Sequence, residues 1–314
     1  MNFGRVKGQV RAARILSGLL QSGRIPNALL FTGMDGIGKT LMAVEFARAL
    51  FCQERKGPGE PACGFCSDCL AVDRRNHSDL ALVNGQYQAF LEEKEAEKQK
   101  ILHVETICHV RRDMEMPSML GRWKIAIIED AHRMNSSAAN ALLKNLEEPI
   151  PHSLWILVTS GRDQLPRTIP SRCSAVPFVP LAEPAVRAIL EDQGVAPERA
   201  AVAAGLCEGS ASRALELAAG EYPEALYSGP MAAFEAADSL PRESYLARGQ
   251  VEAALFALSQ DLRLKHLQGG LPFARVERPL RELVRLRQAL RSNADPKVVL
   301  TLAGLAVEST VTPL

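Results

Sequence analysis

The residues with the clearest chemistry lie between Gly33 and Thr40. The sequence Gly33-Met34-Asp35-Gly36-Ile37-Gly38-Lys39-Thr40 fits the phosphate-binding pattern G-x-x-x-x-G-K-[ST] at every position. In that pattern the glycines let backbone N–H groups point at phosphates, the lysine reaches the β and γ oxygens, and the hydroxyl holds Mg²⁺. We therefore predict that this loop binds ATP and Mg²⁺. There are two alternatives. The match could be due to chance, or the loop could keep the shape of such a site but rarely hold nucleotide.

Two acidic residues stand where such a site needs carboxylates. Glu129 and Asp130 directly follow the apolar run 124–128. A nucleotide-hydrolysing site of this kind uses one acid near the metal and another near the attacking water. We expect Glu129 near Mg²⁺ and Asp130 near the water. The alternative is that both acids merely end a buried strand.

Four of the seven cysteines are close together, at Cys52, Cys63, Cys66 and Cys69. The two overlapping C-x2-C steps suit a tetrahedral Zn²⁺ with thiolate ligands at about 2.3 Å. Glycines between Cys52 and Cys66 provide the turns that bring the first cysteine back to the others. No open coordination position is implied, so we predict a structural zinc. A redox dithiol and a set of unliganded thiols are the alternatives.

The elements that must hold these residues alternate in type up to about residue 180. The apolar runs 28–32, 124–128 and 154–158 are typical of strands buried on both faces of a mostly parallel sheet. A helical pattern, 41–50, follows the phosphate-binding loop, and the stretches between the runs are long enough for crossover helices. The sequence therefore predicts an α/β P-loop domain over 1–179, with the zinc module at 52–69.

Strand patterns stop after Pro180. Three short helical patterns follow, which predicts a three-helix lid domain over 180–222. The rest, 223–314, favours an all-α domain of longer helices. The expected helix breaks are at Pro241, Gly269-Gly270, Pro279 and Pro296.

Composition bounds the class of protein. The chain has 314 residues, 47% of them hydrophobic and 23% charged, which is ordinary for a globular protein of two or three domains. The formal net charge is +1, so any nucleic-acid contact comes from a local patch or from partners. The first residues lack the apolar core of a secretory signal. With clustered cysteines and no run long enough to cross a bilayer, we expect a reduced, cytoplasmic protein without a membrane partner.

Several motifs in order resemble one known family. The phosphate-binding loop, the four-cysteine insertion, the segment from Ala138 to Pro149, and Ser171-Arg172-Cys173 occur in the order found in the bacterial clamp-loader ATPases of the AAA+ class. That family holds gamma/tau motor subunits and a delta-prime subunit. The similarity covers residues 1 to about 220 well and the remainder more weakly. It implies an AAA+ domain, a lid, and a helical collar through which subunits assemble.

The resemblance also implies roles for single residues. Arg172 would be an arginine finger that reaches, in trans, the γ-phosphate bound by a neighbouring subunit. Thr159 stands where a sensor hydroxyl contacts the γ-phosphate side. The alternatives are an arginine in a salt bridge at a strand end and an ordinary threonine that ends a strand.

Within the family, two features resemble the delta-prime type. Active AAA+ ATPases usually end the second strand Asp-Glu, but here the order is Glu129-Asp130, which leaves Asp130 one methylene short of the base position. The lid helix of the motor subunits carries a sensor arginine where this chain has Ser212, and Arg213 lies about 100° further around the helix. We therefore expect little ATP hydrolysis by the chain itself.

The resemblance implies partners as well. They are the gamma/tau and delta subunits, and through the complex the sliding clamp and primer-template DNA. An ATP-hydrolysing gamma/tau-type motor is the main alternative. A zinc-containing P-loop kinase is a more distant one, which should lack both Ser-Arg-Cys and the trailing helical domains.

Overall fold

The computed structural model describes residues 3, 5–93, 101–120, 122–219, 226, 229–241, 244–267 and 269–311. They form two compact units, Met1–Ala185 and Val186–Leu314.

A five-stranded sheet lies at the centre of the first unit. Its strands are β1 (Ala28–Thr32), β2 (Leu80–Val83), β3 (Lys124–Ile128), β4 (Ser153–Thr159) and β5 (Ser174–Pro177). Their order is β2-β3-β4-β1-β5, and every neighbouring pair is parallel. The three strands predicted from continuous apolar runs are present and occupy the middle of the sheet. The two edge strands, β2 and β5, were not predicted, because each is short and only partly buried.

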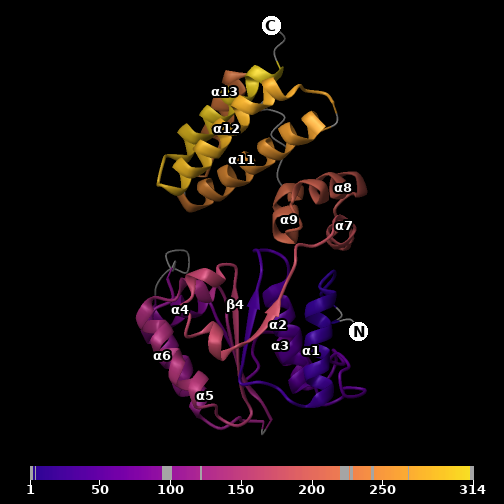
Figure 1. The fold of residues 1–314 in the computed structure, drawn as a ribbon, viewed down its shortest axis with the longest axis vertical. Helices are drawn as coiled ribbons and strands as arrows, with labels where there is room; N and C mark the ends of the chain where they lie inside the picture. The colour runs from indigo at the N-terminus through magenta and orange to yellow at the C-terminus, as the bar shows by residue number, and fades with distance from the viewer. Residues whose placement is uncertain are drawn as a thin grey trace. The chain divides into compact units, whose positions relative to one another are not determined.

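Helices cover both faces of this sheet (Figure 1). On one side lie α1 (Val10–Ser22), α2 (Lys39–Phe51) and α3 (Ser67–Asp73). On the other lie α4 (Gly85–Glu92), α5 (Val104–Glu115) and α6 (Ser136–Glu147). Short 3-10 turns, η2 (Ala131–Arg133), η3 (Arg162–Gln164) and η4 (Pro170–Arg172), join the later strands to their neighbours. The predicted α/β architecture is confirmed, and it follows from strands that are apolar on both faces and need cover on both.

The core between the sheet and α5–α6 is made of large apolar side chains. Trp155, Ile107 and Leu142 are fully buried there. Because the strands are parallel and alternate with these helices, the carboxyl ends of β1, β3 and β4 all lie at the same end of the sheet.

The second unit is helical throughout its described residues. Its helices are α7 (Glu183–Asp192, which begins in the first unit), α8 (Pro197–Leu206), α9 (Ala211–Ala219), α10 (Pro230–Asp238), α11 (Ser244–Leu267), α12 (Phe273–Arg291) and α13 (Pro296–Val311). The first three match the predicted short helices. The expected end of the lid at residue 222 lies outside the described residues, so the division into lid and collar stays a prediction.

One expected helix break is wrong. Pro279 lies inside α12 rather than at its end. A proline within a helix removes one backbone hydrogen bond and usually kinks or ends it. Here Val276, Leu283 and Leu286 are buried in the core of the unit on either side of the proline. Their burial keeps the helix continuous.

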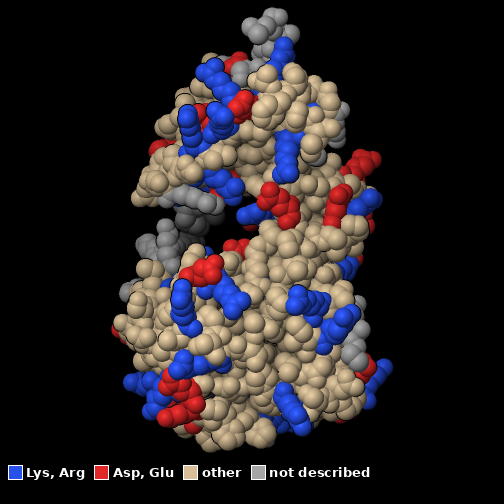
Figure 2. Space-filling model, in the orientation of Figure 1, with Lys and Arg blue, Asp and Glu red and all other residues tan. Residues whose placement is uncertain are grey.

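Charged side chains of both signs are interspersed on the face seen in Figure 2. This agrees with the net charge of +1. None of the helices in the described part of the chain is both long and apolar enough to span a membrane.

Candidate nucleotide and metal sites

The phosphate-binding loop joins β1 to α2, as predicted. Gly33, Gly36 and Gly38 have φ angles of 150°, 74° and 90°, which side chains disfavour. At Gly33 an added Cβ would lie 2.8 Å from the carbonyl oxygen of Phe178. The curled backbone and the start of α2 at Lys39 therefore suit a phosphate group, and the glycines are required for this shape.

Lys39 is buried against its own loop. Its Nζ donates hydrogen bonds to the carbonyl oxygens of Gly33 at 2.7 Å and Met34 at 2.6 Å, and it lies 3.6 Å from a carboxylate oxygen of Asp35. Burial lowers the pKa of Lys39, and the carboxylates of Asp35 and Asp130 oppose that shift. The ammonium is thus placed at the mouth of the loop, where a phosphate oxygen could replace the carbonyls as its acceptor.

The other residues expected near ATP gather at the same edge of the sheet. Thr159 ends β4 directly beside Thr32, which ends β1, and its carbonyl accepts a 3.3 Å hydrogen bond from the N–H of Gly33. The Thr159 hydroxyl accepts a hydrogen bond from the N–H of Gly161 at 3.1 Å and lies 3.3 Å from Nδ1 of His132. His132 was not predicted, because it shares no motif with Thr159.

The two acids end β3 but face different neighbours. Glu129 accepts a 2.9 Å hydrogen bond from the side-chain amide of Asn84, at the end of β2. Asp130 adopts φ 47° and pairs with Arg133 at 3.3 Å. Asn84 was also missed from the sequence, because the strand before it was not predicted. The structure thus brings both acids to the carboxyl end of the sheet, where the phosphate-binding loop also lies.

Arg172 lies at the other end of the strands, where they begin. The register of β5, with Ser174 beside Leu29, puts Arg172 before the start of the strands, whereas Gly33 follows their ends. At about 3.3 Å per residue, roughly 20 Å of strand separates the two levels. The guanidinium pairs with Glu147 at 2.7 Å and donates to the carbonyl of Thr168, and it stays 36% exposed. Arg172 therefore cannot reach the loop of its own chain, but it is accessible to another molecule.

Arg213 is engaged within the second unit. Its guanidinium lies 3.5 Å from a carboxylate oxygen of Glu208 and 5.0 Å from the ring centre of Phe256, a cation–π distance. Arg287 approaches the same ring at 5.7 Å. Ser212, where the resemblance implies a sensor arginine, is uncharged.

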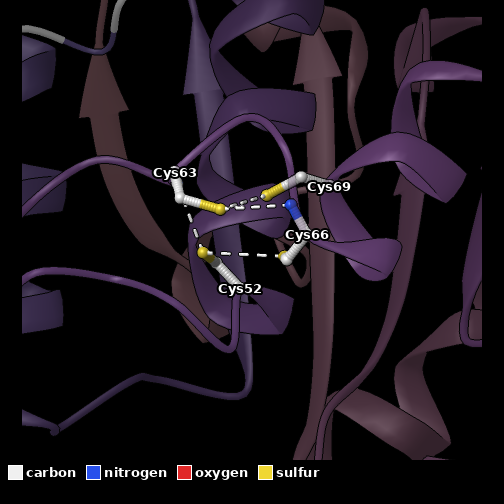
Figure 3. A group of neighbouring side chains, drawn as sticks. All are labelled: Cys52, Cys63, Cys66 and Cys69. Atoms are coloured by element: carbon white, nitrogen blue, oxygen red, sulfur yellow. Dashed lines mark hydrogen bonds between the residues drawn. The ribbon is translucent and has the colours of Figure 1, made fainter.

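The four predicted cysteines converge (Figure 3). All four sulfurs lie within 4.8 Å of one another, with Cys63 and Cys69 at 3.8 Å and Cys52 and Cys66 at 4.0 Å. A zinc tetrahedron with bonds of about 2.3 Å has sulfur–sulfur edges of about 3.8 Å. All four are free thiols. The cluster could bind a metal, and its spacing fits a tetrahedral ion.

Backbone N–H groups support the sulfurs. Cys63 donates to the sulfur of Cys52 and Cys66 to that of Cys63, both at 3.3 Å. Burial raises the pKa of Cys66, but N–H groups of Cys69 and Gln53 outweigh it and lower that pKa to about 6. Burial raises the pKa of Cys52 and of Cys69. A divalent cation bound among these four sulfurs would favour the thiolate form of each cysteine.

Comparison with known proteins decides the family. The family model described as DNA polymerase III, delta subunit, matches residues 8–182. The chain belongs to this family. The match covers the sheet, the loop and the cysteine cluster, and it confirms the predicted clamp-loader AAA+ class.

Relatives of two kinds are similar to the chain. DNA polymerase III subunit delta' of Bacillus subtilis is 33% identical over 209 residues, which cover 67% of this chain and 59% of that relative. DNA polymerase III subunit tau/gamma of Haemophilus influenzae is 33% identical over 171 residues, which cover 54% of this chain and 23% of the relative. The chain thus spans less than two thirds of the length of each of these two relatives.

A solved structure supports the fold. A DNA polymerase III gamma subunit-related protein of Thermotoga maritima superposes with a TM-score of 0.54 at 15% identity, over 95% of this chain and 99% of that one. At this identity the likeness shows the fold alone.

Proposed function

We propose that this chain is the delta-prime-type subunit of a DNA polymerase III clamp loader. It assembles with gamma/tau and delta subunits, helps load the sliding clamp onto primed DNA, and supplies Arg172 to the ATP of a neighbouring subunit. The observation that carries this proposal is the position of Arg172. It is exposed at the amino-terminal end of the strands, whereas its own phosphate-binding loop lies at their carboxyl end. An arginine so placed can act on a nucleotide only between subunits.

The chain's own site supports a minor role in hydrolysis. Lys39, Thr40, the loop glycines and Thr159 would hold ATP, with Mg²⁺ near Thr40 and Glu129. Asp130, which occupies the position of the base, is one methylene shorter than glutamate and pairs with Arg133. Arg213 is held by Glu208 and Phe256. A bound ATP would therefore meet no full-length base, and Arg213 is already engaged within its own unit.

We assign the four cysteines to a structural Zn²⁺. A bound zinc supplies a cross-link between the end of α2 and the start of α3. Cys52 lies just after α2, while Cys69 lies within α3. The second unit is assigned to the lid and the collar.

A gamma/tau-type motor is the second candidate, favoured by the intact phosphate-binding loop. Hydrolysis of ATP by the isolated chain distinguishes the two. A motor subunit turns over ATP when assembled with itself alone, whereas a delta-prime-type chain shows almost no turnover.

The test of Arg172 is the steady-state ATPase rate of a reconstituted loader with clamp and primed DNA. Arg172→Ala should lower that rate about tenfold or more, because the guanidinium offsets negative charge that develops on the γ-phosphoryl group. Arg172→Lys should rescue poorly, since a point ammonium does not reproduce the planar fork. Folding, zinc content and assembly should be unchanged.

Two control variants separate this role from a structural one. Glu147→Gln breaks the ion pair of Arg172 but keeps the guanidinium, so it should leave the rate nearly normal. Arg187→Ala removes another exposed arginine that pairs with a glutamate, at 2.8 Å, and should also have little effect. If Glu147→Gln lowers the rate as much as Arg172→Ala does, Arg172 acts through its salt bridge and the proposal is wrong.

A further inference from the structure

The hydroxyl of Thr159 is held between two partners. It is fully buried, accepts a hydrogen bond from the N–H of Gly161 at 3.1 Å, and lies 3.3 Å from Nδ1 of His132. We propose that His132 is a positioning residue that directs this hydroxyl toward the terminal phosphate, so that the site distinguishes ATP from ADP. The inference rests on the proposed nucleotide binding of this chain.

The direction of the hydroxyl follows from a count of hydrogens. A threonine hydroxyl has one hydrogen to donate and can accept two hydrogen bonds. Gly161 already fills one acceptor position. If Nδ1 of His132 carries a hydrogen, it fills the second, and the hydroxyl hydrogen is free for another acceptor. If Nδ1 is bare, it takes that hydrogen itself. His132 therefore decides whether Thr159 can donate elsewhere.

Thr159 lies at the strand end beside the phosphate-binding loop, so a terminal phosphate held there would meet it once the contacts that bury its hydroxyl shift. Its strand, β4, is paired with β1, and the phosphate-binding loop starts at Gly33, whose N–H donates to the carbonyl of Thr159. Ligands of parallel α/β sheets bind outside the carboxyl ends of the strands, which is this edge. An anionic oxygen there favours the arrangement in which His132 donates to Thr159 and Thr159 donates to the phosphate.

The backbone fixes His132 in its place. It is the middle residue of η2, which is closed by a 2.7 Å hydrogen bond from the N–H of Arg133 to the carbonyl of Asp130. The carbonyl of Arg133 accepts a 3.0 Å hydrogen bond from the N–H of Leu102. On the other side, the Asn135 side chain caps α6 by accepting from the N–H of Ala138 at 2.8 Å. The backbone that carries the ring is thus held by its turn, and the ring itself contacts Thr159.

We expect this link to change the affinity for ATP and not the affinity for ADP. A chain of donors from imidazole to hydroxyl to a charged oxygen strengthens each link, and a hydrogen bond to a charged group is worth about a factor of ten or more in affinity. ADP lacks the phosphate concerned, so its affinity should not depend on His132.

The experiment measures the dissociation constants of the full chain for Mg-ATP and Mg-ADP by titration calorimetry. His132→Phe keeps the size of the ring but removes both nitrogens, and it should lower the ratio of ATP to ADP affinity about tenfold. Thr159→Val should lower it by the same factor. The double variant should lose no more than either single variant, because both remove the same link. His132→Asn should keep most of the ratio, since its amide takes the place of Nδ1.

Each other outcome overturns the inference. It is wrong if His132→Phe leaves the ratio unchanged, if it weakens both nucleotides equally, or if the two single effects add. His132→Leu serves as the ring-free variant should His132→Phe not fold. Lys39→Ala is the control that should weaken both nucleotides. A wild-type chain that binds neither nucleotide also overturns it, whereas the delta-prime role is tested separately, by the Arg172 assay and by ATP turnover of the isolated chain.

Discussion

Cys66 contributes twice to the cysteine cluster, through its thiol near Cys52 and through its N–H bond to the sulfur of Cys63. Cys66→Ser should therefore lower the zinc content from one equivalent to near zero and lower the stability of the first unit, because metal binding is coupled to the folding of this segment. Metal analysis of fresh protein prepared without chelators measures the zinc.

Cys108→Ser is the matched control for this prediction. Cys108 is a half-buried free thiol away from the cluster, so its loss should leave zinc in place. Wild-type protein with less than about a tenth of an equivalent would exclude a structural zinc with the affinity expected of such sites.

His77 gives the first unit a dependence on pH. It is buried, stacks on Phe51 with ring centres 3.9 Å apart, and accepts a 3.2 Å hydrogen bond at Nδ1 from the N–H of Asp79. Burial lowers the pKa of His77 below its ordinary value of 6.5, against the opposing charges of Asp68 and Asp79. The unfolded chain thus binds the proton more readily than the folded one. Stability should fall as the pH drops below about 6.5 and level off below the folded pKa.

The test compares unfolding by urea at several pH values for wild-type protein and His77→Asn. The asparagine keeps an acceptor for the N–H of Asp79 but does not titrate, so its stability should fall less between pH 7.5 and 5.5. Loss of metal at low pH affects both proteins, and the difference between them isolates His77. Equal slopes would show that His77 does not contribute.

At the scale of the elements, the contact of α10 with α13 depends on a glycine. An added Cβ at Gly304 would overlap the Cβ of Ala233, which is fully buried. Gly304→Ala should therefore push the two helices apart and destabilise the second unit by about 1–3 kcal/mol, despite the better helix propensity of alanine. Urea unfolding measures the loss.

Gly249→Ala is the matched control within the same unit. Gly249 is exposed in α11, and nothing lies within 4 Å of the position of its Cβ. Alanine there should stabilise the helix by about 0.5–1 kcal/mol. If both variants stabilise the protein, the close approach of α10 and α13 is not important for stability.

At the scale of the whole molecule, each of the two units has a hydrophobic core among its described residues. One surrounds Trp155 between the sheet and α5–α6, and the other surrounds Leu258 and Leu283 among the last helices. Units with their own cores can unfold independently. We expect two thermal transitions, of which chelation of metal lowers one and Gly304→Ala the other. A single transition lowered by both changes would contradict this.

The sequence by itself determined the local parts of this protein. The phosphate-binding loop, the three central strands and the cysteine spacing each depend on residues close along the chain. Glycines at fixed positions curl a loop, continuous apolar runs form doubly buried strands, and two C-x2-C steps form a metal knuckle. The motifs taken in order also determined the family, which the match over residues 8–182 confirms.

Only the tertiary structure decided which distant residues meet. The register of β5 puts Arg172 at the opposite end of the strands from Lys39. The order of the strands brings His132 to Thr159 and gives Glu129 the partner Asn84. These pairings depend on how the whole core is packed. A short window of sequence does not contain the information needed to choose among the possible packings. The same reason explains the missed edge strands and the continuous helix through Pro279, where burial of neighbouring side chains outweighs local preference.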